Sequence, residues 1–207
     1  MYTHHKLAVL GAAGVSAIAL SDAVTHGLTG HYSMFADDSG NDLAIVVGDL
    51  IHAALYACLV IVLAREADRF DASNKVARLS RRVLVVAFGA LSVCMAVPVS
   101  LMDQKSTPSD ILGIIATIFF LAMILFSMTL GLAVLRSNPL GIGGRLLGAI
   151  LPVLLFTIGV AFAAPDWAHP GYLEATINFG LALVGVRAVG VSRSTVPAPP
   201  RSQLGRA

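Results

Sequence analysis

Six apolar runs, each about as long as a bilayer is thick, are the feature that most constrains this chain. They lie at roughly 7–26, 43–64, 83–102, 110–135, 146–164 and 172–190. A helix needs about 20 mostly apolar residues to cross the hydrocarbon core. Only 13% of the residues are charged, against about a quarter in a soluble domain. The sequence therefore predicts an all-α, polytopic integral membrane protein, with residues 1–190 forming a single six-helix transmembrane domain.

The basic residues indicate how these spans are oriented. Thirteen of the 14 Lys and Arg residues belong to the N-terminus, the loops 65–82 and 136–145, or the C-terminal end, and only Lys105 lies in the other loops. Cytoplasmic loops carry the excess of Lys and Arg. We therefore expect a multi-pass protein of the cell (inner) membrane with both termini in the cytoplasm. The formal charge of +2 then reflects topology and does not indicate nucleic-acid binding.

Some segments call for separate expectations. The first run resembles a signal peptide in part, but it continues through small residues beyond Leu20, so we expect it to stay as a span.

Ala13, Ala17 and Ser21 repeat every four residues and should let another helix of the same chain approach closely. The loop 65–82 predicts a short cytoplasmic helix, and residues 191–207 predict a disordered basic tail. Pro98 and Pro152 should kink the third and fifth spans.

The second apolar run carries three polar residues on one face. Asp49 and His52 are three residues apart, and His52 and Tyr56 are four apart, so a helix places them together. Counted from Leu43 at ~1.5 Å per residue, Asp49 lies about 9 Å and His52 about 14 Å below the outer surface. A charged Asp near the bilayer centre costs roughly 2.5–3.5 kcal/mol. We therefore expect this face to point into the helix bundle.

Further polar residues lie at the outer ends of the other spans except the fifth, whereas the inner halves have almost none. They are Asp22, His26, Asp103, Asp110, Glu174 and Asn178. Several have simpler explanations: the aspartates suit helix caps, and Glu174 suits the positive end of a helix dipole. Asp49 with His52 is the pair that such explanations cover least well. The asymmetry predicts a functional site in the outer half.

The residue types at this site suit acid–base chemistry. An Asp that orients an imidazole makes a general acid–base unit near neutral pH. The first hypothesis is an integral-membrane enzyme acting on a lipid-like or isoprenoid substrate, for example by acid-initiated cyclisation or isomerisation. Its predicted catalytic residues are Asp49, His52, Glu174 and Asp22. Its predicted substrate-binding residues are Tyr56, Asn178, His26 and Asp103.

Two other functions fit the same residues. A proton-linked transporter or ion-conducting protein would use an outward-facing Asp/His/Glu vestibule for proton relay, and six spans would then favour a homodimer. An accessory subunit of a membrane complex would need no site of its own. We expect membrane lipids as partners, no cofactor and no metal, because HxxxH and HExxH spacings are missing. The spans also contain no Lys that could hold retinal, and Cys58 and Cys94 suit packing.

Overall fold

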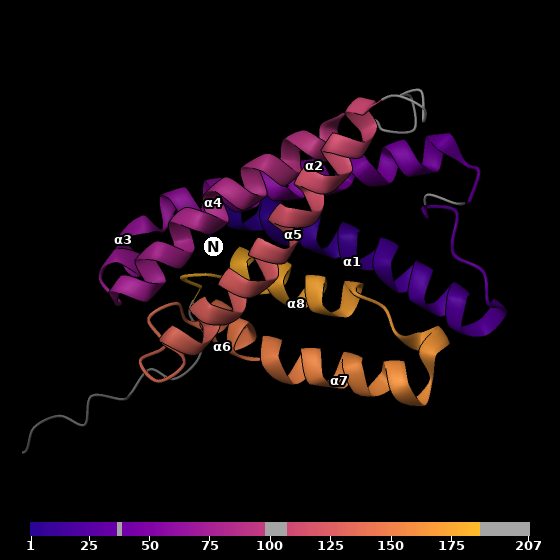
Figure 1. Cartoon of the computed structure of the whole chain (residues 1–207). Coiled ribbons are helices and arrows are strands. Elements are labelled where there is room, and N and C mark those ends of the chain that lie inside the picture. The colour runs from indigo at the N-terminus through magenta and orange to yellow at the C-terminus, as the bar shows by residue number, and fades with distance from the viewer. Residues whose placement is uncertain (37–38, 98–106, 187–207) are drawn as a thin grey trace, which may run out of the picture.

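The computed structural model describes residues 1–36, 39–97 and 107–186, and every element in those ranges is a helix (Figure 1). The prediction of an all-α chain is confirmed. The elements in chain order are α1 (Thr3–Thr29), α2 (Asp42–Arg65), α3 (Ala67–Asp71), α4 (Lys75–Ala96), α5 (Thr107–Val134), α6 (Ile142–Gly148), α7 (Ile150–Ala163), the 3₁₀ turn η2 (Pro165–Trp167) and α8 (Gly171–Ala182).

Five stretches of helix are long and apolar enough to cross a membrane. They are Thr3–Thr29, Asp42–Arg65, Lys75–Ala96, Ile111–Val134 and Ile142–Ala163. Large apolar side chains are exposed along α5 and α7, as expected for surfaces that face lipid; they include Ile114, Ile118, Leu121, Leu155, Phe156 and Phe162. Five of the six predicted spans thus have the length and composition of a membrane helix.

The predicted sixth span, 172–190, corresponds to a shorter helix. α8 has 12 residues, fewer than the roughly 20 needed to cross the core. Its end is fixed by the chain at the start of α6, where the amides of Ile142 and Gly143 donate to the carbonyls of Val186 and Leu183. Residues 187–190 lie outside the described part, so a sixth complete span stays a prediction. The predicted disordered tail 191–207 and Asp103 also lie outside it.

The helices alternate in direction, and one end of the bundle gathers the basic residues. The start of α1, the α2–α4 connection, the α5–α6 connection and the end of α8 meet there, which we call the basic end. Asn74, for example, donates from Nδ2 to the carbonyl of Ala133. Its described cations are Lys6, Arg65, Arg69, Lys75, Arg78, Arg81, Arg82, Arg136 and Arg145. The opposite end holds residues 30–36, 39–41 and 164–170, where Trp167 packs on Gly27.

The third span begins earlier than the sequence predicts. Asn74 accepts a hydrogen bond from the amide of Ala77 at 2.8 Å, which caps α4 at Lys75. Arg78 and Arg81 therefore lie on the first turns of α4 and contact Asp71, and the helix predicted in the loop is the five-residue α3. α4 ends at Ala96, two residues before Pro98, because a residue that precedes proline disfavours the helical conformation.

Pro98 lies outside the described residues, so the kink expected there stays a prediction. The prediction for Pro152 is confirmed at the junction of α6 and α7. Pro152 has no amide hydrogen to donate, and the helix is interrupted three residues earlier at Ala149. The prediction for the small residues of α1 is wrong: Ala13, Ala17 and Ser21 are exposed. α1 packs instead through a neighbouring face, whose buried residues include Ala8, Ala12, Val15 and Ala23.

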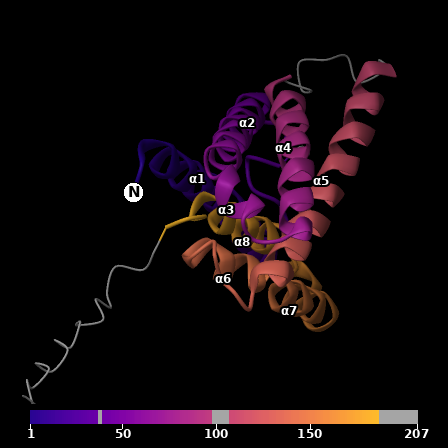
Figure 2. The same ribbon diagram turned by 90° about the vertical axis from the view of Figure 1, so that its left-hand side faces the viewer.

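α8 is the most central helix although it is short. It packs against α1 and α2 on one side and against α6 and α7 on the other (Figure 2). Close approach to α6 depends on glycine, because a Cβ at Gly143 would lie 2.4 Å from the carbonyl oxygen of Gly180. The position of α8 therefore depends on a backbone-to-backbone contact at the basic end.

We predict that Gly143→Ala destabilises the protein by about 1–3 kcal/mol, because the added methyl group overpacks the α6–α8 contact. The matched control is Gly159→Ala in α7, where no atom lies within 4 Å of the new Cβ. That control should be neutral or stabilising by about 1 kcal/mol, since Ala favours helix. Unfolding in mixed detergent micelles measures both. Equal stability of the two variants would contradict the packing described for α8.

Candidate acid–base site

The carboxylate of Glu174 is the centre of a polar group inside the bundle. Tyr56 donates from its hydroxyl to Glu174 Oε1 at 2.6 Å, and Asn178 Nδ2 lies 3.4 Å from the same oxygen. Tyr56 is 2% and Asn178 0% exposed. Three residues predicted for the site, from α2 and α8, are therefore in contact.

His52 completes this group. Its Nδ1 lies 2.9 Å from the carbonyl oxygen of Gly48, and a carbonyl can only accept, so Nδ1 donates. In the neutral imidazole, Nε2 is then the free acceptor. This nitrogen lies 3.8 Å from Glu174 Oε1, which is too long for a hydrogen bond. A polar atom placed beside the pair could contact both groups at once.

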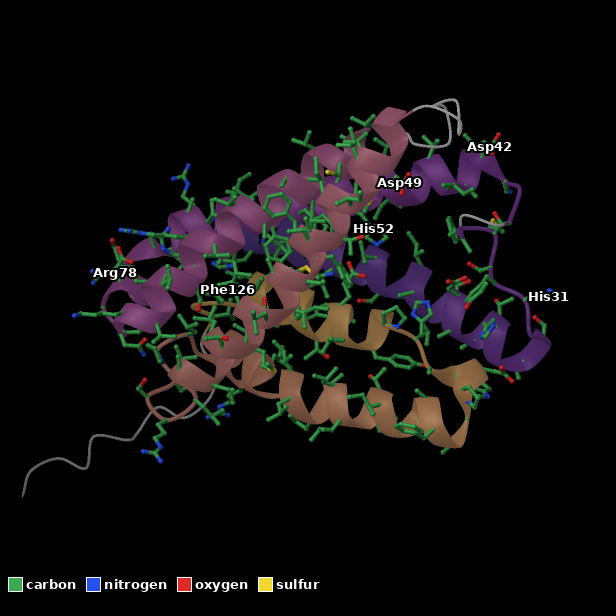
Figure 3. The ribbon with its side chains drawn as sticks, viewed as in Figure 1. His31, Asp42, Asp49, His52, Arg78 and Phe126 are labelled. Atoms are coloured by element: carbon green, nitrogen blue, oxygen red, sulfur yellow. The ribbon has the colours of Figure 1, made fainter. Side chains whose placement is uncertain are left out.

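Asp49 lies one turn from His52 along α2 (Figure 3). It is half-buried. His52 contacts the Gly48 carbonyl, Glu174 and the ring of Tyr56, and these contacts help to orient the imidazole. The role of Asp49 as the partner of His52 stays a prediction.

The depth of Glu174 is set by the irregular chain before α8. Residues 164–170 run along α1: Trp167 contacts Gly27, and Gly171 lies against Ala19 two turns further down. α8 therefore begins well inside the bundle, and Glu174 falls in its first turn. The positive end of the helix dipole favours a carboxylate there. Non-helical backbone at this depth is acceptable because α1 covers it.

A second acid–histidine pair lies closer to the opposite end. Asp22 Oδ2 is 3.2 Å from Nε2 of His169, and Asp22 Oδ1 accepts from the amide of Ser33 at 2.7 Å. The amide of Gly171 donates to His169 Nδ1 at 3.0 Å, so Nε2 of the neutral ring carries the hydrogen that Asp22 accepts. Sequence reasoning missed His169 because it lies in a connection, outside every predicted span.

The remaining predicted residues are not brought into the group around Glu174. His26 Nδ1 lies 2.7 Å from the carbonyl oxygen of Asp166, and its ring stacks on Tyr32. These contacts tie α1 to η2 at the opposite end. Asp103 falls in 98–106, outside the described residues.

An apolar layer separates the group around Glu174 from the basic end. On α2, the stretch between Tyr56 and Glu66 presents Leu59, Val62 and Leu63 to the interior, all fully buried. Beyond that layer lies another polar group that sequence reasoning missed, formed by His4, His5 and Glu66. The adjacent histidines before the first apolar run are the signal in the sequence that could have indicated it.

Comparison with models of known families, with curated proteins and with solved structures finds no significant match for this chain. Function is therefore inferred from the geometry of its own residues.

We predict that Tyr56→Phe lowers the free energy of unfolding by about 1–3 kcal/mol, because the carboxyl group of Glu174 loses its shortest hydrogen bond inside the bundle. Tyr32→Phe is the control: Tyr32 is 48% exposed, and a phenyl ring can still stack on His26. Unfolding in mixed micelles measures both variants. The described geometry is contradicted when Tyr56→Phe is as stable as the control.

Proposed function

We propose that this chain is a multi-pass protein of the cell (inner) membrane and an enzyme that uses Glu174 and His52 for acid–base catalysis on a lipid-like substrate. One observation carries the proposal: a carboxylate held by Tyr56 and Asn178 faces the free nitrogen of His52 across 3.8 Å. The asymmetric distribution of Lys and Arg supports a cytoplasmic basic end.

The chemistry proposed is a proton shift along an alkene. The protonated carboxyl group of Glu174 adds its proton to one carbon, and His52 Nε2 removes a proton from a neighbouring position. The double bond moves, and the proton on His52 returns to Glu174, so no proton is consumed. Tyr56 and Asn178 both donate to Oε1, which leaves Oε2 to carry the proton. The same acid can start a cyclisation.

Partial exposure of the pair supports access for such a substrate. The side chains of His52 and Glu174 are 21% and 12% exposed, so neither is sealed in the core. In this proposal Asp49 lies one turn nearer the outer surface, and Asp22 with His169 binds the polar end of the substrate. An apolar tail would extend into the bilayer.

Proton-linked transport is the second candidate, and a specific observation favours it. Acid–histidine pairs occur at three levels along α1, α2 and α8: Asp22 with His169, Glu174 with His52, and Glu66 with His5. Such chains mark proton relays in transporters. The apolar layer between Glu174 and the basic end favours the enzyme, since a relay must cross that layer.

Exchange of solvent deuterium into lipids tests the proposed function. The purified protein is incubated in D₂O with a lipid extract of its source cells, and lipid masses are compared before and after. We expect the wild type to add deuterium to one lipid class, and Glu174→Gln and His52→Ala to slow this at least about 100-fold. The control is Asp166→Asn, an exposed acid at the opposite end, which should react as the wild type does.

A pH-sensitive dye inside proteoliposomes gives the contrasting result. The enzyme proposal would be wrong, and the transporter proposal supported, if protons enter the proteoliposomes in a way that depends on Glu174 while no lipid gains deuterium. If the folded wild-type protein shows neither deuterium exchange nor proton entry, the remaining hypothesis is the accessory subunit.

A further inference from the structure

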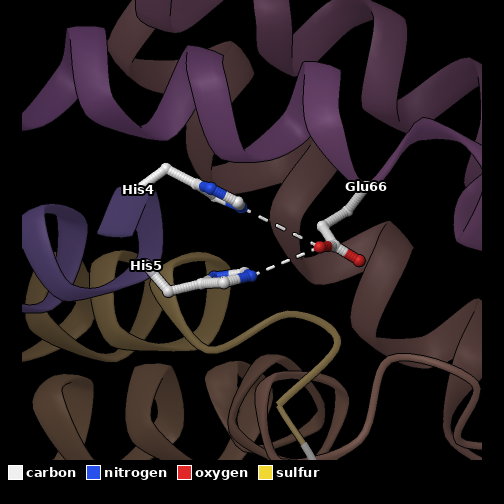
Figure 4. A group of neighbouring side chains, drawn as sticks. All are labelled: His4, His5 and Glu66. Carbon is white, nitrogen blue, oxygen red and sulfur yellow. Dashed lines mark hydrogen bonds and ion pairs between the residues drawn. The ribbon is translucent and has the colours of Figure 1, made fainter. Parts of the chain in front are cut away.

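Two histidines and a glutamate meet at the basic end, away from the proposed catalytic pair. His4 and His5 open α1, and Glu66 follows the last residue of α2. Figure 4 shows the three side chains pointing toward one another. Glu66 Oε1 lies 3.3 Å from His5 Nε2 and 3.9 Å from His4 Nε2. One ligand atom from each residue lies within 4.8 Å of the other two.

The backbone selects the form of His5 that binds a metal ion. His5 Nδ1 lies 2.9 Å from the carbonyl oxygen of Ala182 and therefore donates to it. The lone pair of the neutral ring is then on Nε2, which faces Glu66 Oε1. Two acceptors that face each other need a cation or a proton between them. A ring N–H held by a carbonyl is also the usual support of a metal-bound histidine.

His4 presents a second nitrogen that lacks a partner. Its Nε2 is buried and has no hydrogen bond to any residue in the described part of the chain. A buried polar atom left without a hydrogen-bond partner is unfavourable. A cation between His4, His5 and Glu66 would satisfy it, because each nitrogen would bind through its lone pair.

Arg69 fixes the orientation of the carboxylate. Its Nε donates to Glu66 Oε2, so Oε1 is the oxygen left for a cation. Arg69 also balances the charge of Glu66. The burial of His5, which is 2% exposed, means that these ligands are held by packing as well as by hydrogen bonds.

We propose that His4, His5 and Glu66 form a binding site for a divalent transition-metal ion of the zinc class. Two imidazoles and one carboxylate are a known zinc ligand set, which leaves a fourth position open for water. Ligands about 2.0–2.1 Å from a tetrahedral zinc ion stand roughly 3.4 Å apart. The 3.3 Å between His5 and Glu66 already matches. His4 Nε2 lies 3.9 Å from the same oxygen and within 4.8 Å of the His5 ligand atom, so the His4 side chain has to move inward to bind.

The site would join three helices of the bundle. His4 and His5 bring α1, Glu66 follows α2, and Ala182 is the last residue of α8. The same helices carry Asp22, His52 and Glu174. A metal ion at the basic end would therefore stabilise the scaffold of the candidate site, without taking part in its chemistry.

The test is metal binding by the full-length protein, purified without a polyhistidine tag. After treatment with EDTA, the protein is mixed with ZnCl₂, desalted and analysed for zinc by mass spectrometry, and its thermal unfolding is followed with and without the metal. We expect one zinc ion per chain and a higher melting temperature with zinc. His4→Gln and Glu66→Gln should each weaken binding by at least roughly 10–100-fold.

His31→Gln is the control, because His31 is exposed in the connection after α1; it should bind zinc as the wild type does. His4→Gln is the more decisive variant, since His4 is only partly buried and its loss should leave the fold intact. The proposal is overturned by a wild type that retains no zinc, or by a His4→Gln variant that binds it equally well. The His5–Glu66 contact would then be an ion pair with a protonated imidazole.

Discussion

The arrangement of this bundle depends on one constraint: polar groups in its apolar interior must find partners within the chain. Glu174 satisfies it through Tyr56 and Asn178. These contacts come from α2 and α8, so they fix which faces of the two helices meet. The same requirement pairs Asp22 with His169. Polar groups thus specify a packing that apolar side chains alone would leave less defined.

Helical periodicity was enough to predict the composition of the site but not its assembly. The spacing of His52 and Tyr56, and of Glu174 and Asn178, places each pair on one helix face, and the structure joins these faces. The Asp49–His52 pair follows from the same rule and stays a prediction. The sequence does not indicate that the Gly48 carbonyl and Glu174 also contact the imidazole. A backbone carbonyl is present at every residue, so sequence cannot show which one a side chain selects.

Connections account for most of what the sequence did not predict. The start of α4 depends on the cap by Asn74, and the depth of α8 depends on how residues 164–170 follow α1. His169, His4 and His5 lie in or beside such segments, where hydropathy gives no information. Their partners, Asp22 and Glu66, are 147 and 61 residues away. Contacts of that kind follow only from the packing of whole helices.

The apolar layer beyond Tyr56 bears most directly on the choice between catalysis and transport. Tyr56 and Glu66 are ten residues apart on or just after α2, which corresponds to about 15 Å. A proton relay needs donors or water over that distance, whereas Leu59, Val62 and Leu63 fill it here. Transport would require α2, α8 and α1 to separate near the basic end. A cation bound by His4, His5 and Glu66 would oppose that separation. The group around Glu174 would then stay closed toward the basic end.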